Sequence, residues 1–152
     1  MSDQPTAVTL RDGSTVHIRA ITTLDRDREQ AFVRKLSAES RYFRFMNSLR
    51  ELDAHQLERF THPDPAHEIV LVALADLTSD AEQLGVARCA WEERSSQAEF
   101  AIVVADAMQG KGLGSALMRE LIERARRRGI ARLEGLVLAN NYRMLELMRT
   151  LG

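Results

Sequence analysis

The apolar run Phe100-Ala-Ile-Val-Val104, then Gln109-Gly-Lys-Gly-Leu-Gly114 and an amphipathic segment over 115–128, decides the fold of this chain. A strand, a glycine-rich turn and a helix leave backbone N–H groups pointing outward where the helix begins. The positive end of the helix dipole favours an anion there, such as a diphosphate. Glycine tolerates positive φ and lets the anion approach the backbone, whereas a side chain at Gly112 would occupy the anion's space.

The spacing of the glycines narrows the choice of phosphate ligand. A Walker A loop needs Ser or Thr after its Gly-Lys pair, but Gly112 follows Lys111 here. A dinucleotide fingerprint needs Gly-x-Gly-x-x-Gly, which Gly110 and Gly112 do not continue. A glycine turn without a ligand is the alternative, and the strand and helix on either side argue against it.

Length and composition are those of one globular domain over residues 1–152. The net charge of −1 argues against a general affinity for nucleic acid or anionic membrane. No apolar stretch is long enough to cross a bilayer, and the single Cys89 rules out an internal disulfide. We therefore expect a soluble cytoplasmic protein without a nucleic-acid or membrane partner.

Strands and helices alternate in a pattern typical of an α+β domain. Asp12-Gly13 predicts a hairpin between two alternating runs over 8–18, and Asp53 predicts the start of a helix. The predicted helices cover 24–36, 37–46, 52–60, 115–128 and a last segment that begins at Asn140 or Asn141. The further predicted strands cover 69–74, 84–91, 97–104 and 133–138.

Two parts of the chain resemble a known superfamily. The residues from Ala98 to Asp106, Gln109 to Gly114, and Asn141 to Gly152 resemble the coenzyme-binding part of GNAT N-acetyltransferases. In the N-terminal half, Leu10–Gly13 and the run Leu36–Phe45 are similar to the acetyltransferase domain of Pat-type bacterial protein acetyltransferases, which acetylate lysines on proteins.

The resemblance implies the GNAT acyl-CoA N-acyltransferase fold, a mixed, mostly antiparallel sheet flanked by helices. A complete domain of this kind continues through two more strands beyond the position of Gly152. We therefore expect either a C-terminal truncation or a second copy, as in a homodimer, that covers the sheet edge at 133–138.

The resemblance also implies acetyl-CoA as co-substrate and an amine as acceptor, either a protein lysine or a small amine. Carried over residue by residue, it assigns pantetheine contacts to backbone groups of Ile102, Val103 and Val104. The diphosphate would be held by Gln109, Gly110, Lys111, Gly112, Leu113, Gly114 and Ser115. Asn141 would lie near the pantetheine or the diphosphate.

Glu99 is the candidate general base. Amine acetylation needs a neutral nitrogen, whereas a free lysine with a pKa of about 10.4 is protonated at neutral pH. A carboxylate can take that proton, directly or through water, and Glu99 lies in an otherwise apolar strand. The family often places a tyrosine late in the last helix as the acid, but Met148 stands there and cannot donate a proton.

Other reactive residues have simpler interpretations. The arginines at 124, 126–128 and 132 could reach a coenzyme phosphate, but i,i+4 pairs with glutamates favour a solvated helix face. Arg41–Phe45 is interpreted as helical core with an arginine rim rather than an RNA surface. We expect no metal site, because His62 and His67 flank Asp64 without a second cluster, and we expect Cys89 to fill the core.

Three functions remain open. The first is an N-acetyltransferase that works by direct transfer in a ternary complex, on a protein lysine or on a small amine. The second is a module that senses acyl-CoA without catalysis, which the absence of a tyrosine at Met148 favours. The third, a small nucleic-acid binder built around Arg41–Phe45, is disfavoured by the near-neutral charge.

Overall fold

The computed structural model describes residues 4–46, 50–136, 138 and 140–152. The strands are β1 (Thr6–Thr9), β2 (Thr15–Ala20), β3 (Glu68–Leu74), β4 (Gln83–Ala90), β5 (Gln97–Val104) and β6 (Arg132–Glu134). The helices are α1 (Arg26–Lys35), α2 (Ala38–Phe45), α3 (Ala54–Thr61), α4 (Leu113–Arg127) and α5 (Tyr142–Leu151), with short 3₁₀ turns η1 (Thr23–Asp25) and η2 (Asp106–Met108).

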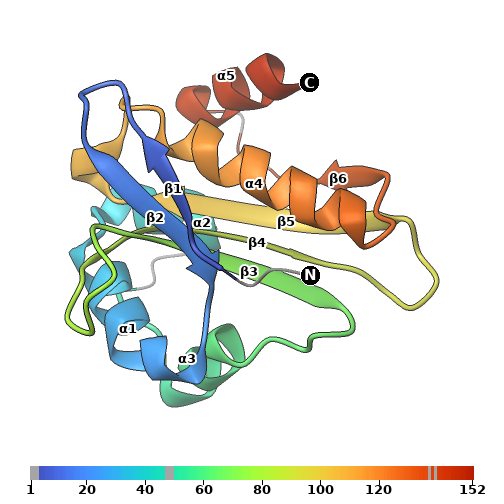
Figure 1. Cartoon of the computed structure of the whole chain (residues 1–152), viewed down its shortest axis with the longest axis horizontal. Helices are drawn as coiled ribbons and strands as arrows, with labels where there is room; N and C mark the ends of the chain where they lie inside the picture. Colours follow the sequence, from blue (N-terminus) through green and yellow to red (C-terminus); the bar gives the residue numbers. More distant parts are fainter. Residues whose placement is uncertain (1–3, 47–49, 137, 139) are drawn as a thin grey trace.

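The strands form one sheet in chain order, from β1 to β6. Neighbouring strands are antiparallel as far as β5, and β5 and β6 are parallel. A parallel pair needs a crossover connection, which α4 supplies. Figure 1 shows α4 along one face of the sheet, with α1 and α3 on the other side. The predicted mixed, mostly antiparallel sheet flanked by helices is confirmed.

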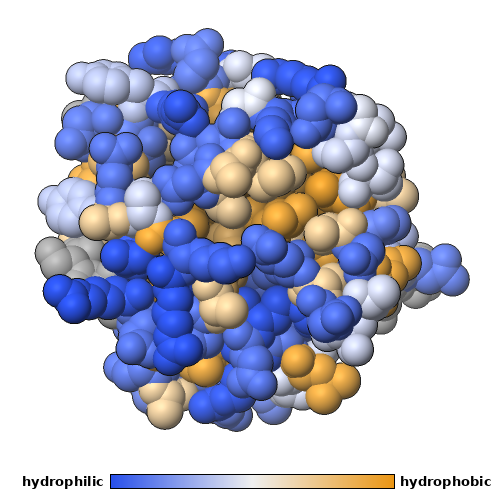
Figure 2. Space-filling view, turned by 90° about the vertical axis from the view of Figure 1, so that its left-hand side faces the viewer, coloured by the Kyte–Doolittle hydropathy of each residue, from blue (hydrophilic) through white to orange (hydrophobic). Residues whose placement is uncertain are grey.

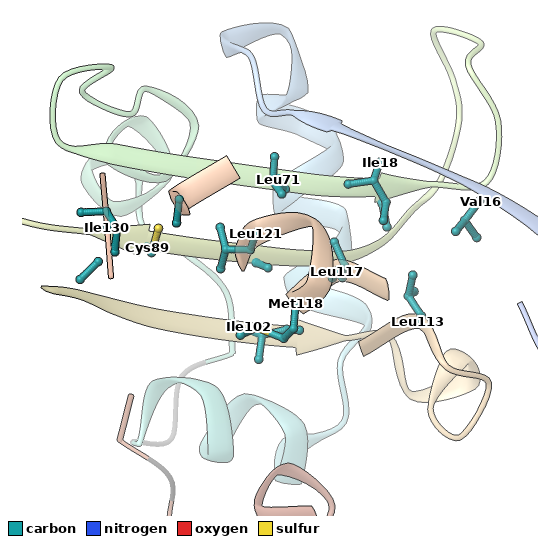
Figure 3. Close-up of a cluster of buried hydrophobic side chains, with 14 of the residues drawn as sticks. Val16, Ile18, Leu71, Cys89, Ile102, Leu113, Leu117, Met118, Leu121 and Ile130 are labelled. Atoms are coloured by element: carbon teal, nitrogen blue, oxygen red, sulfur yellow. The ribbon is translucent and has the colours of Figure 1, made fainter. Parts of the chain in front are cut away.

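The first core lies between α4 and the sheet (Figure 3). Leu113, Leu117 and Leu121 are spaced by four residues, so they form one stripe, and all three are fully buried. Burial of such a side chain stabilises the fold by about 1.5–3 kcal/mol. At Gly85 in β4, an added Cβ would lie 2.8 Å from Leu117 Cδ1, so this strand needs glycine to let the helix approach.

The second core lies on the opposite face of the sheet, under α1 and α3. Phe32 and Val33 from α1 pack there with Val72 from β3. β3 also supplies Leu71 to the first core, because successive residues of a strand point to opposite faces. This explains the continuous apolar run over 69–74.

The predicted helices are all present, with bounds that shift by one or two residues. The helix predicted over 24–36 begins at Arg26, after the turn η1, and Leu24 is 90% exposed instead of joining the apolar stripe. The helix after the glycine turn begins at Leu113 rather than at residue 115. Asp53 caps α3 as predicted: its side chain accepts a hydrogen bond from Gln56 N–H at 2.8 Å.

The strand predicted over 133–138 is shorter in the structure, because β6 ends at Glu134. Gly135 lies against the ring of Phe100, where an added Cβ would be 2.8 Å from the nearest ring atom. The chain therefore passes over this ring instead of continuing along β5. Val137, part of the predicted strand, lies outside the described residues.

Within the described ranges, no helix is both long and apolar enough to cross a membrane.

Candidate functional site

The glycine turn, defined here as Gln109–Gly114, connects η2 to α4 and ends in an open array of donors. Gly110 and Gly112 have φ of 83° and 93°, values that residues other than glycine rarely adopt. In the described part of the chain, the N–H groups of Gly110 and of the four residues 112–115 have no hydrogen-bond acceptor. Four of these N–H groups belong to the start of a 15-residue helix, which suits them to an anion.

The hairpin between β1 and β2 supports this turn from one side. Arg11 N–H donates to Lys111 O at 3.1 Å, and Arg11 Nη1 donates to Gly110 O at 3.4 Å. Lys111 Nζ lies 3.3 Å from Asp12 Oδ2. An added Cβ at Gly112 would meet Arg11 Nε at 3.5 Å. Glycine is needed at position 112 for its backbone angle. A side chain there would point toward Arg11, whereas the sequence predicted that it would occupy the anion's space.

The strand that leads to the turn, β5, separates from its neighbour β6 along its length. β5 and β6 pair at Gln97↔Arg132, at Ala98↔Leu133 and last at Glu99↔Glu134. β5 stays paired with β4 as far as Val104. Among the described residues, the backbone of 100–104 therefore has no strand partner on the β6 side. The side chains of Ile102 and Val103 are buried, so only the backbone groups of these residues are open to a ligand.

Glu99 lies at the point where the strands separate. Its side chain is exposed, whereas the sequence suggested apolar surroundings. It alternates onto the same face as Val103, which packs in the second core. Glu134 lies directly opposite in the register, and its carboxylate is held 3.2 Å from Arg132 Nε. Sequence analysis missed Glu134, because register across a parallel pair is invisible in one sequence.

Gln109 is predicted to hold the diphosphate, but its side chain has other partners in the structure. Its amide nitrogen donates to Ser40 Oγ at 3.3 Å and to Val104 O at 3.4 Å. Its amide oxygen accepts from Arg143 Nη1 at 2.8 Å. The side chain thus ties the turn to α2 and α5, and the backbone N–H of this residue donates to Asp106 O at 3.3 Å, so neither donor faces a ligand in the structure.

Asp106, just after β5, reinforces the tie to α2. Its carboxylate accepts the backbone N–H of Ser37 at 3.0 Å and the hydroxyl of Ser40 at 3.1 Å. Burial works to raise the pKa of this carboxyl, but the hydrogen bonds outweigh burial and hold the pKa below its ordinary value. The sequence carried no signal for this contact, which joins residues far apart in the chain.

The last helix begins beside the glycine turn. Asn141 caps α5, and its side-chain oxygen accepts Met144 N–H at 3.3 Å. An added Cβ at Gly114 would meet Leu147 Cδ2 at 3.2 Å, so α5 packs on the start of α4. Met148 packs against the first core, and Tyr142 is 76% exposed. Figure 2 views the end of the molecule with the hairpin and the glycine turn, where apolar side chains gather near the centre of a polar rim.

The aromatic and basic run in α2 is half-buried, apart from Tyr42, which is 45% exposed. Phe45 stacks on Phe60 with ring centres 6.2 Å apart. The Arg44 guanidinium lies 4.8 Å from the centre of the Phe45 ring, and burial lowers the pKa of Arg44 to about 10. This agrees with the interpretation as core with an arginine rim. Cys89 is buried as expected, with 1% of its surface exposed.

Comparisons with known proteins agree with this geometry. Residues 27–152 match the family described as "Acetyltransferase (GNAT) family". The chain belongs to the GNAT family of acetyltransferases. It is therefore an acyltransferase, and acetyl-CoA is the co-substrate of its family.

Individual relatives of this GNAT chain cover most of its length. The GNAT domain of S. lividans PAT has a TM-score of 0.90 and 34% identity, over 97% of this chain and 86% of that one. Acetyltransferase PA5475 of Pseudomonas aeruginosa is 35% identical over 143 residues, 94% of this chain and 77% of its own. Acetyltransferase Pat of Mycolicibacterium smegmatis is 32% identical over 97% of this chain, which spans 44% of that longer protein.

Proposed function

We propose that this GNAT acetyltransferase moves the acetyl group of acetyl-CoA to a primary amine, the side chain of a lysine on a protein. The observation that carries the proposal is the separation of β5 and β6 after Glu99 and Glu134, beside the open N–H groups of the glycine turn. A thioester arm beside β5 and a diphosphate at α4 fit this arrangement.

The coenzyme would be held mainly by backbone groups. The diphosphate accepts hydrogen bonds from the N–H groups of 112–115, where the positive end of α4 contributes about half an elementary charge. The pantetheine pairs with the open backbone of Ile102 to Val104 like an added strand. Asn141, whose oxygen is used by the cap of α5, has its side-chain nitrogen left to donate to this arm.

Glu99 would act as general base. Its exposed carboxylate lies at the mouth of the separation, where it can accept a proton from an incoming ammonium group, directly or through water. The neutral nitrogen then bonds to the thioester carbon, the carbon–sulfur bond breaks, and the second proton of the nitrogen passes to solvent water. Backbone N–H groups of the open strand polarise the carbonyl oxygen during this step. The thiol, with a pKa of about 8.5, leaves as the thiolate without an acid at Met148.

The acceptor class rests on two features. The N-terminal half resembles Pat-type protein acetyltransferases, and relatives with 32–34% identity carry the name Pat. Two carboxylates, Glu99 and Glu134, lie on neighbouring strands at the mouth. Glu134 is paired with Arg132, so Glu99 is the carboxylate that favours the approach of a cationic amine such as lysine. A cytoplasmic location, as the sequence predicts, would supply both acetyl-CoA and such proteins.

The experiment compares acceptors with acetyl-CoA as donor. The panel contains lysine peptides, a folded lysine-rich protein and the small amine spermidine, and mass spectrometry identifies the acetylated nitrogen. We expect acetylation of lysine ε-nitrogens, with the small amine at least tenfold slower. Transfer to spermidine alone would contradict the protein acceptor. Coenzyme binding without transfer to any acceptor would instead favour an acyl-CoA sensor.

A further inference from the structure

A cavity of about 380 Å³ lies at the opposite end of α4 from the glycine turn. β2 and β3 pair as far as Ala20↔Leu71, whereas β3 and β4 stay paired as far as Glu68↔Ala90. The first residues of β3 are thus free of β2, and the cavity opens beside them. Its volume lies at the lower end of the range for small-molecule sites, about 300–1,000 Å³.

One part of the cavity wall is apolar, and another part is basic. Ile21 and Val70 are buried and line it with Ile69. Three arginines from the end of α4 also line it: Arg124, Arg127 and Arg128. Mostly apolar walls with a few placed polar groups are typical of sites for small molecules.

Arg124 is held in place through its Nε, which leaves the two terminal nitrogens of its guanidinium available. Its side chain is 13% exposed, and its Nε lies 3.0 Å from Glu120 Oε1. Thr6 also donates to that oxygen at 3.3 Å, which fixes the glutamate. Across the described residues, neither Nη of Arg124 has an acceptor. A guanidinium fork matches a carboxylate or phosphate with two parallel hydrogen bonds.

Arg128 is positioned in a similar way. Its Nη2 donates to Pro65 O at 2.8 Å, and its guanidinium lies 5.2 Å from the centre of the Trp91 ring. Its other nitrogens have no acceptor within the described ranges. The side chain of Arg127 is more exposed, and its Nε lies 3.5 Å from Glu123 Oε1. Arg124 and Arg128 are therefore the arginines that contacts hold at the cavity wall, near the end of α4.

Two further groups oppose an anion there, besides the glutamates paired with Arg124 and Arg127. The carboxylate of Glu68 also lines the cavity, although Asp64 N–H donates to it at 3.1 Å. The C-terminal end of α4 carries about half a negative charge, and its last carbonyls accept N–H groups of 128–130. The carboxylates of Glu120 and Glu123 partly neutralise Arg124 and Arg127. The attraction for an anion therefore comes from Arg128 and from the Nη groups of Arg124, which have no acceptor among the described residues.

We propose that this cavity is a second ligand site, which binds a small organic anion: an apolar body with one carboxylate or phosphate group. Arg124 and Arg128 grip the acid group, and the body lies on Ile21, Ile69 and Val70. The site is distinct from the coenzyme site, because the ends of the 15-residue α4 are about 20 Å apart.

The test is a titration of the 152-residue chain by heteronuclear NMR, with coenzyme A at saturation to occupy the glycine turn. The probes are phenyl phosphate, benzoate and the uncharged benzyl alcohol. We expect phenyl phosphate or benzoate to shift the amide resonances of residues that line the cavity. Benzyl alcohol should bind with an affinity at least tenfold lower. The better of the two anions identifies the acid group.

Arg124→Gln should lower the affinity for the tighter-binding anion at least tenfold. Arg128→Gln provides a second variant if the first disturbs the fold. Arg126→Gln is the matched control, because Arg126 lies on the same helix, binds Glu123 at 3.2 Å and does not line the cavity. Three results would overturn the proposal: no cavity shift with either anion, equal affinity for benzyl alcohol, or equal weakening by Arg126→Gln.

Discussion

At the scale of single residues, Glu99→Gln is the sharpest change to the proposed chemistry. The amide keeps the shape of the side chain but cannot accept a proton. We expect turnover to fall about 10²- to 10⁴-fold, with the affinity for acetyl-CoA almost unchanged. The loss should shrink at high pH, where the amine deprotonates by itself. Steady-state kinetics against pH and calorimetry measure the two quantities.

Glu134→Gln is the matched control for this prediction. Glu134 lies opposite Glu99 but is held by Arg132, so its loss should reduce turnover much less. Wild-type turnover of Glu99→Gln at neutral pH would remove Glu99 from the mechanism.

Cys89 tests the packing of the first core at the same scale. Burial raises the pKa of its thiol from 9.0 to about 11. The unfolded chain therefore releases this proton first, so the contribution of the thiol to stability is complete below pH 9 and is lost as the pH rises toward 11. We expect no thiol labelling of the native protein at neutral pH and a falling unfolding midpoint above pH 9. Rapid labelling of the native protein would show that the core is open.

At the scale of elements, the link between the glycine turn and α2 makes a prediction about Asp106→Asn. The amide keeps one acceptor oxygen for the partners Ser37 and Ser40 and replaces the other by a donor. A hydrogen bond to a charged group contributes about 1.5–3 kcal/mol, so the amides of α2 should exchange roughly tenfold faster or more. Hydrogen exchange with mass spectrometry measures this, and calorimetry should show little change in coenzyme affinity.

Asp76→Asn is a matched control, because Asp76 also accepts one backbone N–H and one hydroxyl, both from Thr78. It should leave exchange in α2 unchanged. If Asp106→Asn leaves that exchange unchanged as well, the carboxylate does not hold α2.

The elements also show what the sequence could predict. The sequence predicted β5 over 97–104 with its observed bounds, because the apolar run 100–104 is half-buried or buried along its whole length. The glycine turn was predictable, because strand, glycines and helix are contiguous. The shortened β6 was not, because its end depends on Gly135 meeting the ring of Phe100, a contact between distant residues. The hydrogen bond from the hairpin to Lys111 and the bond from Gln109 to Ser40 could not be predicted for the same reason.

At the scale of the whole molecule, β6 forms the edge of the described sheet, and Leu136 just beyond it is 77% exposed. We expect the 152-residue chain to self-associate through this edge, because unpaired backbone groups beside apolar side chains bind a second chain. Size-exclusion chromatography with light scattering measures the mass, and Leu136→Glu should shift it to the monomer. A monomer mass for the unchanged chain at high concentration would contradict this prediction.

The central claim is that the backbone of the glycine turn holds acetyl-CoA, and calorimetry on Gly112→Val tests it most directly. Valine is strained at a φ of 93°, so the turn must shift and its N–H groups lose their common direction. We expect affinity to fall by about 1–3 kcal/mol, roughly ten- to a hundredfold. Gly129→Val introduces the same strain, at a φ of 83°, at the other end of α4 and should leave the affinity unchanged. Unchanged affinity in Gly112→Val, or equal losses in both variants, would contradict the account.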